Sequence, residues 1–169
     1  MPKGRFARLL PLAIATVPFT SAAHGQVEAK SPVHVTVNGV FLICPTLVGS
    51  GGSFPEAELQ KLGFALASEP GSKSPRFKAL GDMGMMTVEY EADTKTCILN
   101  YGGGGYKATA GVVRDVATDN GFKRITGGDR DGAKADVFEG RTPDGKKSAR
   151  MIVIENYTQN TASVSYSEK

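Results

Sequence analysis

Hydrophobic and polar residues alternate along much of this chain with the two-residue period of β-strands. Met86, Val88 and Tyr90, for example, are each followed by a polar residue. Short clusters of Gly, Pro, Asn and Asp separate the alternating segments, as is typical of hairpin turns between antiparallel strands. The pattern predicts eight strands, near residues 64–68, 77–80, 85–91, 96–101, 122–126, 135–140, 151–156 and 161–167.

A helical period predicts a helix over residues 106–120. Arg114 falls outside its apolar stripe, which consists of Ala108, Val112, Val113, Val116 and Ala117. Residues 34–44 fit either a strand or a helix; we favour a helix over the second half, limited by Pro45. A further short helix is predicted to begin at the capping residue Ser53 and to end at Gly63.

The predicted elements occur twice in the same order, a helix followed by four strands, in residues 33–102 and 103–169. Residues 62–64 (LGF) match residues 120–122 (NGF) at an offset of 58. We therefore expect an α+β fold of two tandem helix-plus-four-stranded antiparallel units, with the helices packed on one face of an antiparallel sheet. The alternative is a chance likeness between hairpin-rich segments. In architecture alone, this arrangement resembles the secreted bacterial inhibitor that caps β-lactamases with an open sheet face, which favours a binding module.

The N-terminal segment has the composition of a secretory signal peptide, predicted to span residues 1–25. Three cations, Lys3, Arg5 and Arg8, precede an eleven-residue apolar run and then small residues. Cleavage is expected after Ala23 or Gly25. An uncleaved anchor is the alternative, but a membrane-spanning helix needs about 20 apolar residues. We expect a periplasmic or secreted protein with a flexible leader (26–32), a single domain (33–169) and no transmembrane anchor after cleavage.

Export changes how the charge of the chain is interpreted. The sequence has 20 Lys and Arg against 17 Asp and Glu, and three of the cations lie in the signal peptide. The mature chain is therefore formally neutral and has no basic cluster, so we expect no nucleic-acid partner. In an oxidising compartment Cys44 and Cys97 are expected to form a disulfide; two buried free thiols are the alternative.

The usual catalytic and metal-binding patterns are missing from the sequence. The histidines are His24 and His34 only, so a histidine-based triad or a zinc site has no basis in the body of the domain. Asp129 and Asp131 before Gly132 match only the beginning of a calcium loop, and a turn between strands explains them better. We expect no metal and no cofactor.

The strand period predicts which side chains share a face of the sheet. If Cys97 points toward the helices to meet Cys44, the opposite face is polar. That face is our candidate binding face, and it holds Thr87, Glu89, Glu91, Asn100, Thr161, Ser163 and Ser165. We expect a non-enzymatic module that binds another envelope or secreted protein or a component of the envelope. The alternatives are a small hydrolytic enzyme with an Asp, Glu, Ser and Tyr site, or an envelope stress protein; the sequence gives no oligomeric state.

Overall fold

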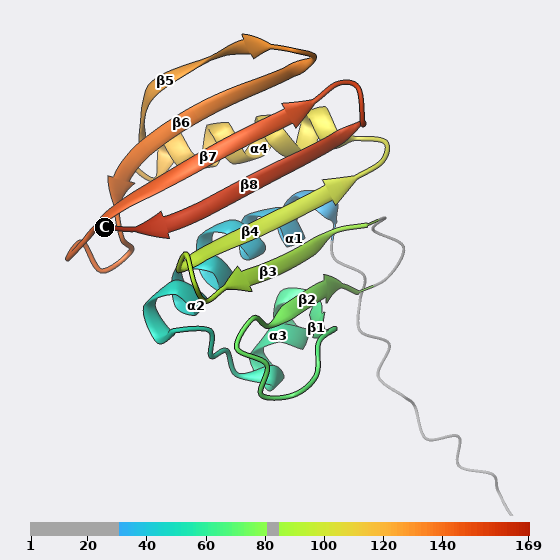
Figure 1. Cartoon of the computed structure of the whole chain (residues 1–169), viewed down its shortest axis with the longest axis vertical. Helices are drawn as coiled ribbons and strands as arrows, with labels where there is room; N and C mark the ends of the chain where they lie inside the picture. The colour runs from blue at the N-terminus through green and yellow to red at the C-terminus, as the bar shows by residue number, and fades with distance from the viewer. Residues whose placement is uncertain (1–30, 81–84) are drawn as a thin grey trace, which may run out of the picture.

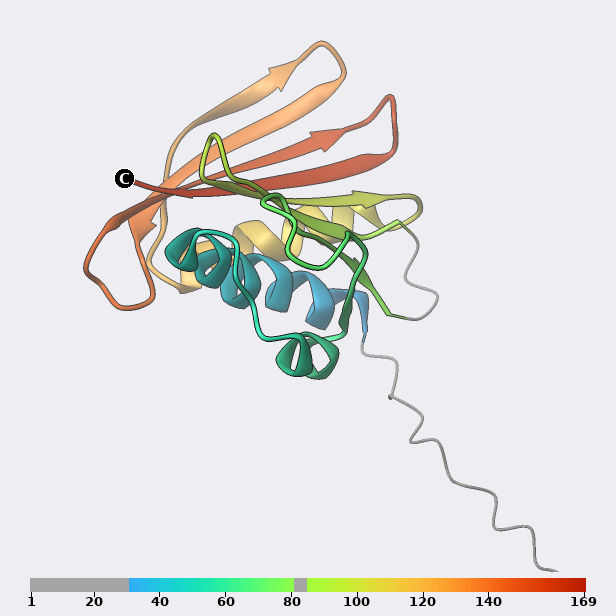
Figure 2. The same cartoon turned by 60° about the horizontal axis from the view of Figure 1, so that its bottom comes forward.

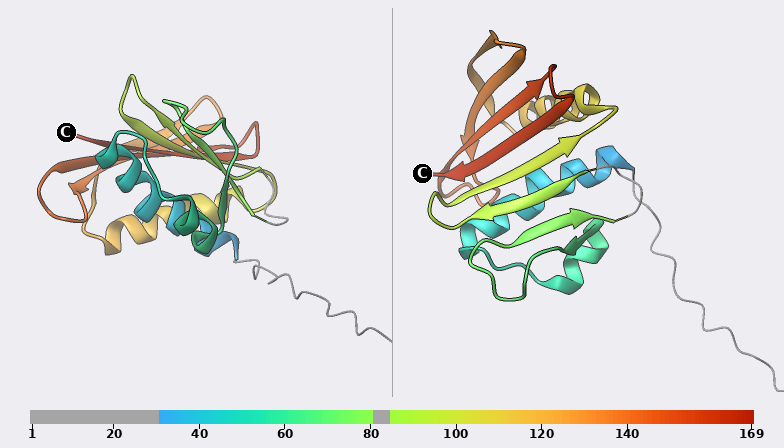
Figure 3. Two further views of the ribbon diagram at one scale, coloured as in Figure 1. Left: turned by 90° about the horizontal axis from the view of Figure 1, so that it is seen from below. Right: turned by 45° about the vertical axis from the view of Figure 1, so that its right-hand side comes forward.

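The computed structural model describes residues 31–80 and 85–169, in which one antiparallel sheet of eight strands has all its helices on one side (Figures 1 and 3). The predicted signal peptide and most of the leader lie outside these residues. The spatial order of the strands is β1-β2-β3-β4-β8-β7-β6-β5. Their bounds are β1 Phe64–Leu66, β2 Arg76–Ala79, β3 Thr87–Glu91, β4 Thr96–Gly102, β5 Lys123–Arg130, β6 Ala133–Arg141, β7 Ser148–Asn156 and β8 Thr161–Glu168.

The strand predictions are confirmed in number and position, and the largest difference is in β5. This strand continues to Arg130, because Gly127 and Gly128 pair with β6. The turn itself is Asp131-Gly132, where both residues have positive φ angles, 51° and 78°. These are the conformations that an Asp-Gly pair adopts in a two-residue hairpin.

One continuous helix covers Pro32–Ser50, which corrects the prediction that it would be limited by Pro45. It consists of α1 Pro32–Asn38, the π-helical turn η1 Gly39–Ile43 and α2 Cys44–Ser50. The Cys44 amide donates to the carbonyl of Gly39, five residues back, so the turn before the proline is wide. Pro45 then lies in the first turn of α2, where a missing N–H and a fixed φ are tolerated.

The second correction concerns α3, Glu56–Leu62, which does not begin with Ser53 as its cap. Its N-cap is Pro55, which has extended backbone angles and no side-chain hydrogen bond to the helix. Ser53 is occupied elsewhere, because its amide and carbonyl both bond the Ser50 hydroxyl. Gly63 ends the helix in the left-handed conformation, with a φ of 91°, as predicted.

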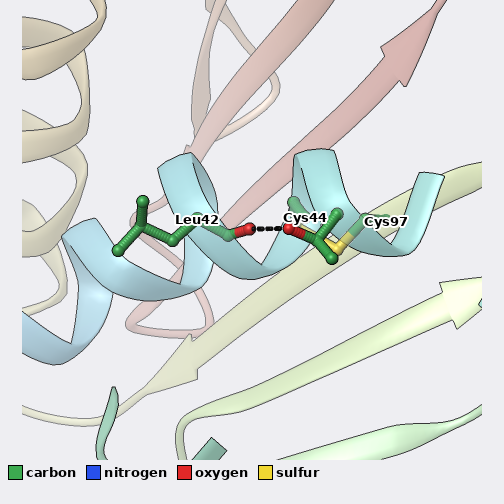
Figure 4. Close-up of a disulfide and its surroundings, with 4 residues drawn as sticks. Leu42, Cys44 and Cys97 are labelled. Carbon is green, nitrogen blue, oxygen red and sulfur yellow. Dashed lines mark hydrogen bonds between the residues drawn. A yellow bond between two sulfur atoms is a disulfide. The ribbon is translucent and has the colours of Figure 1, made fainter. Parts of the chain in front are cut away.

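The disulfide between Cys44 and Cys97 is present and ties α2 to β4, as predicted (Figure 4). Both cysteines are buried in the core between the helices and the sheet. In the same stretch the Thr46 hydroxyl donates to the Leu42 carbonyl over 2.8 Å. A disulfide is compatible with export.

The helix Pro32–Ser50 is the one described helix long and apolar enough to cross a membrane by length and composition. Helices that form the core of a domain meet the same criterion. Here Val35, Val40, Ile43 and Leu47 are fully buried in the core that the helix shares with the sheet. The apolar side of this helix is therefore used for packing within the domain.

Helix α4, Tyr106–Asp119, covers β7 and β8 (Figure 2). Its buried side is rotated from the predicted stripe. Val113 and Ala117 are buried as expected, whereas Ala108 is exposed. Arg114, predicted to lie outside the packed side, instead points to the sheet, where it forms ion pairs. The helical period of the sequence predicted the position of the helix correctly. It placed Arg114 on the wrong side, because the ion pairs of Arg114 form beneath the helix.

Candidate binding face

The face of the sheet opposite the helices is not covered by any described element (Figures 1 and 3). Side chains of alternate residues in each strand point to this face, because the buried residues of the same strands point to the helices. All the predicted face residues lie at these alternate positions: Thr87, Glu89, Glu91, Asn100, Thr161, Ser163 and Ser165. We call this surface the open face.

The strand register brings several of these residues directly together. Thr87 on β3 lies opposite Asn100 on β4, which in turn lies opposite Ser163 on β8. The Ser163 hydroxyl donates to the Asn100 side-chain oxygen over 2.9 Å. These three residues therefore form one row across the centre of the open face. Glu91 lies at the other end of β3 from Thr87, opposite Thr96, and accepts a hydrogen bond from the Thr94 hydroxyl.

A line of small hydroxyl side chains runs along β8 in the middle of the sheet. Its members are Thr161, Ser163, Ser165 and Ser167, which alternate with buried residues. Ser165 lies between Ile98 of β4 and Ile152 of β7. Ser165 thus has larger apolar neighbours on both sides, and Ser163 has one in Ile154, so the open face offers hydroxyl groups and apolar surface together.

Apolar residues of the open face extend from this centre toward β6. Ile154 is 39 % exposed and lies between Ser163 and Ala135 in register. Val137 of β6 lies opposite Ile152. The sequence had indicated this feature, because residues 151–154 are apolar in both strand phases. The neighbours of residues 151–154 on the adjacent strands depend on the strand register, which cannot be predicted from the pattern of a single strand.

Arg76 is a residue of the open face that the sequence prediction missed. It lies on β2 opposite Glu89, and its guanidinium donates to both carboxylate oxygens, over 3.2 and 2.9 Å. The hydrogen bonds and the charge of Glu89 raise the pKa of Arg76. Glu89 is thus held as half of an ion pair on the open face and is not a free carboxylate.

A second ion pair lies at the opposite end of the open face. Lys169 donates to Glu139 over 2.8 Å, and Arg150 lies 3.8 Å from the same carboxylate. The hydrogen bond and charge of Lys169, with Arg150 contributing less, lower the pKa of Glu139. This shift favours the ionised carboxylate and stabilises a fixed charge. It is opposite in direction to the raised pKa of a general acid.

A buried ion network lies on the other side of the sheet, beneath β6 and β7. Arg114 of α4 donates to Asp136 over 2.8 Å and to Glu155 over 2.9 Å. Arg124 of β5 donates to the second oxygen of Asp136 over 2.6 Å. A Cβ atom added at Gly127 would clash with Asp136 and Arg124, so glycine makes room for the network. These contacts join α4 to the second half of the sheet.

Within residues 31–80 and 85–169, no three His, Cys, Asp or Glu side chains come together as a metal site. The open face offers hydrogen bonding by hydroxyl and amide groups, apolar contact and fixed charges. Comparisons of the chain with protein-family models, with curated proteins and with solved structures find no match.

Proposed function

We propose that the protein is an exported, non-enzymatic binding module that uses the open face to contact another envelope or secreted protein. The observation that carries this proposal is the composition of the face at its centre. Ser163, Ser165 and Asn100 offer hydrogen bonds beside Ile152 and Ile154. Protein interfaces combine an apolar centre with about one hydrogen bond per 100–200 Å² in this way.

The size of the open face supports a protein partner. Seven strands, from β2 to β5 in spatial order, contribute four to nine residues each. With a strand spacing of about 4.8 Å and a rise of about 3.3 Å per residue, the face measures roughly 800 Å². A standard protein–protein interface buries about 800 Å² on each partner.

The arrangement of the charges supports the same proposal. The Arg76–Glu89 pair and the Lys169–Glu139 pair lie on either side of the hydroxyl line, on β2–β3 and on β6 with the C-terminus. Interfaces place charged groups at the rim, where they orient a partner and affect the rate of association. The centre of the open face, by contrast, carries no charge at Ser163, Ser165 or Ile152.

We further propose that the two halves are copies of one helix-plus-four-strand unit. In support, the strands of residues 33–102 and of 103–169 each form a meander, and the last strands of the two meanders, β4 and β8, pair antiparallel. The first half has α1, η1, α2 and α3 where the second has α4 alone. Joining two units through their last strands is what places the hydroxyl line of β8 at the centre of the open face.

The proposal is tested by capture of a partner from the envelope fraction of the native cell with immobilised protein. Ser165→Arg introduces a long charged side chain at the centre of the open face. We expect it to reduce the captured partner at least tenfold, the effect of about 1.4 kcal/mol. Asp119→Arg, an exposed change at the end of α4, is the matched control and should leave capture unchanged.

Quantitative mass spectrometry of the captured proteins gives the readout. A protein captured by wild type and by Asp119→Arg, but lost with Ser165→Arg, supports the proposal. If every captured protein is retained equally by Ser165→Arg, the open face is not the binding surface. Circular dichroism of both variants verifies that the fold is intact before the comparison is made.

A further inference from the structure

A cavity of about 350 Å³ lies on the helical side of the sheet, apart from the open face. It is located where the π-helical turn, the end of α4 and the β6–β7 hairpin meet. Five apolar residues form most of its wall: Phe41, Leu42, Pro45, Phe122 and Pro143. A volume of this size is at the lower end of the range for small-molecule sites, which are mostly apolar with a few polar groups.

Phe122 and Leu42, two apolar residues of the cavity wall, differ in how much of each is exposed to solvent. Phe122 is 6 % exposed and packs on β6 at Gly140, where an added Cβ would come within 2.7 Å of the ring. Glycine therefore allows the ring to lie flat as a fixed wall. Leu42 on the other wall is 49 % exposed, although it belongs to the apolar helix of the core. A hydrocarbon group in the cavity would cover apolar surface that now faces water.

Tyr166 also lines this cavity, and its hydroxyl is buried without a hydrogen-bond partner among the described residues. Buried polar groups in native proteins are almost always hydrogen-bonded, so an unpaired one requires an explanation. Burial, followed by the charges of Glu168 and Asp144, raises the pKa of Tyr166. The hydroxyl thus keeps its proton and is available as a donor. An acceptor on a bound molecule would satisfy it.

Arg141 supplies a positive charge at the same cavity. Arg141 is exposed and forms no ion pair with any residue in 31–80 or 85–169. The two carboxylates of this region already have cationic partners. Lys147 lies 2.9 Å from Glu168, and Lys146 lies 3.9 Å from Asp144. Arg141 is therefore the cation left to pair with a ligand, and guanidinium groups favour carboxylates because of their matching geometry.

We infer that this cavity binds a small amphipathic carboxylate, with an aromatic or aliphatic body against Leu42 and Phe122. Its carboxylate pairs with Arg141, and a carboxylate oxygen accepts from the Tyr166 hydroxyl. The inference concerns a different surface from the open face and does not depend on the proposed function. Either can fail while the other stands, because the variants that test the cavity change none of the residues that test the open face.

The test compares two probes with the same skeleton, 4-phenylbutyrate and the neutral 4-phenylbutanol. Titration of the protein is followed by two-dimensional NMR of the backbone amides. We expect the carboxylate to bind about fivefold more tightly than the alcohol, with shifts at the cavity residues. The variant Arg141→Gln should remove this preference. Arg130→Gln, at an exposed arginine of the β5–β6 hairpin, is the matched control and should preserve it.

A second variant, Tyr166→Phe, removes the hydroxyl alone. We expect it to weaken 4-phenylbutyrate about threefold to tenfold, the usual effect of losing one hydrogen bond. The free protein should meanwhile melt at a higher temperature, because a buried unpaired hydroxyl is gone. A role in folding alone would change the melting temperature and leave the affinity as it was.

Three results would overturn the inference. The first is no saturable binding of 4-phenylbutyrate up to about 10 mM, beyond the weakest affinities of specific sites. The second is equal affinity for the acid and the alcohol in the wild-type protein. The third is an unchanged preference for the acid in Arg141→Gln. Any of these results would mean that the cavity is a packing gap between the helix and the hairpin and not a ligand site.

Discussion

Loss of the Cys44–Cys97 disulfide is expected to lower the free energy of unfolding by about 4 kcal/mol. The bridge joins residues 53 positions apart. In the chain-entropy relation, a closed loop of this length reduces the entropy of the unfolded chain by about 14 cal/mol/K, which is about 4 kcal/mol at 25 °C. For a domain of this size the melting temperature should fall by roughly 10–15 °C.

The experiment compares Cys44→Ala, Cys97→Ala and the double variant by urea denaturation. Each single variant already opens the loop, so the cross-link effect predicts that the singles and the double lose nearly the same free energy. The urea dependence should also steepen, because an unbridged denatured chain exposes more surface. If the double variant instead loses the sum of the two singles, packing of the sulfur atoms is the cause and the entropic reasoning is refuted.

Two further variants test the ion pairs. Asp136→Asn removes the buried charge that Arg114 and Arg124 share, and it should cost about 3 kcal/mol in urea denaturation; the exposed change Asp131→Asn should cost less than about 0.5 kcal/mol. Lys169 lowers the folded-state pKa of Glu139. The pair therefore stabilises the folded protein fully above the unfolded pKa of about 4.3. This stabilisation is lost as the pH falls through the lower folded-state pKa. Glu139→Gln should therefore flatten the decline of the urea midpoint below about pH 4.3, and an unchanged decline would contradict this assignment.

Much of the fold could be predicted from the sequence because its strongest patterns are local. Alternation and turn residues located all eight strands, and the Asp-Gly pair at 131–132 marked a hairpin turn. The phase of Cys97 also divided the residues of β4 correctly between the two faces. Each of these inferences needs only a few consecutive residues, whose side-chain directions follow from backbone geometry.

The rest depended on contacts between distant segments. A proline such as Pro45 normally ends or kinks a regular α-helix. Here the π-helical turn 39–43 precedes it, and the helix continues through Pro45. From the sequence alone, Arg114 is predicted to face solvent. In the fold it contacts Asp136 of β6 and Glu155 of β7, which lie far from it in the sequence. Arg76 belongs to the candidate site only through the register of β2 with β3. The contacts of Arg114 and Arg76 join segments that are distant in the sequence, so the periodicity of a single helix or strand could not predict them.

The position of the disulfide within the strand order has a consequence for biosynthesis. Every residue between Cys44 and Cys97 precedes α4, and the strands β1 to β4 pair with one another in a meander. A chain that emerges from its N-terminus can therefore oxidise and close its first half before β5 to β8 exist. The second meander pairs with the first through β4 and β8, which among the described strands is the one pair whose members are not consecutive in the chain. Such long-range pairing is slow to form. The bridge and the first meander thus need no residue of the second half, whereas the pairing of β4 with β8 needs both halves.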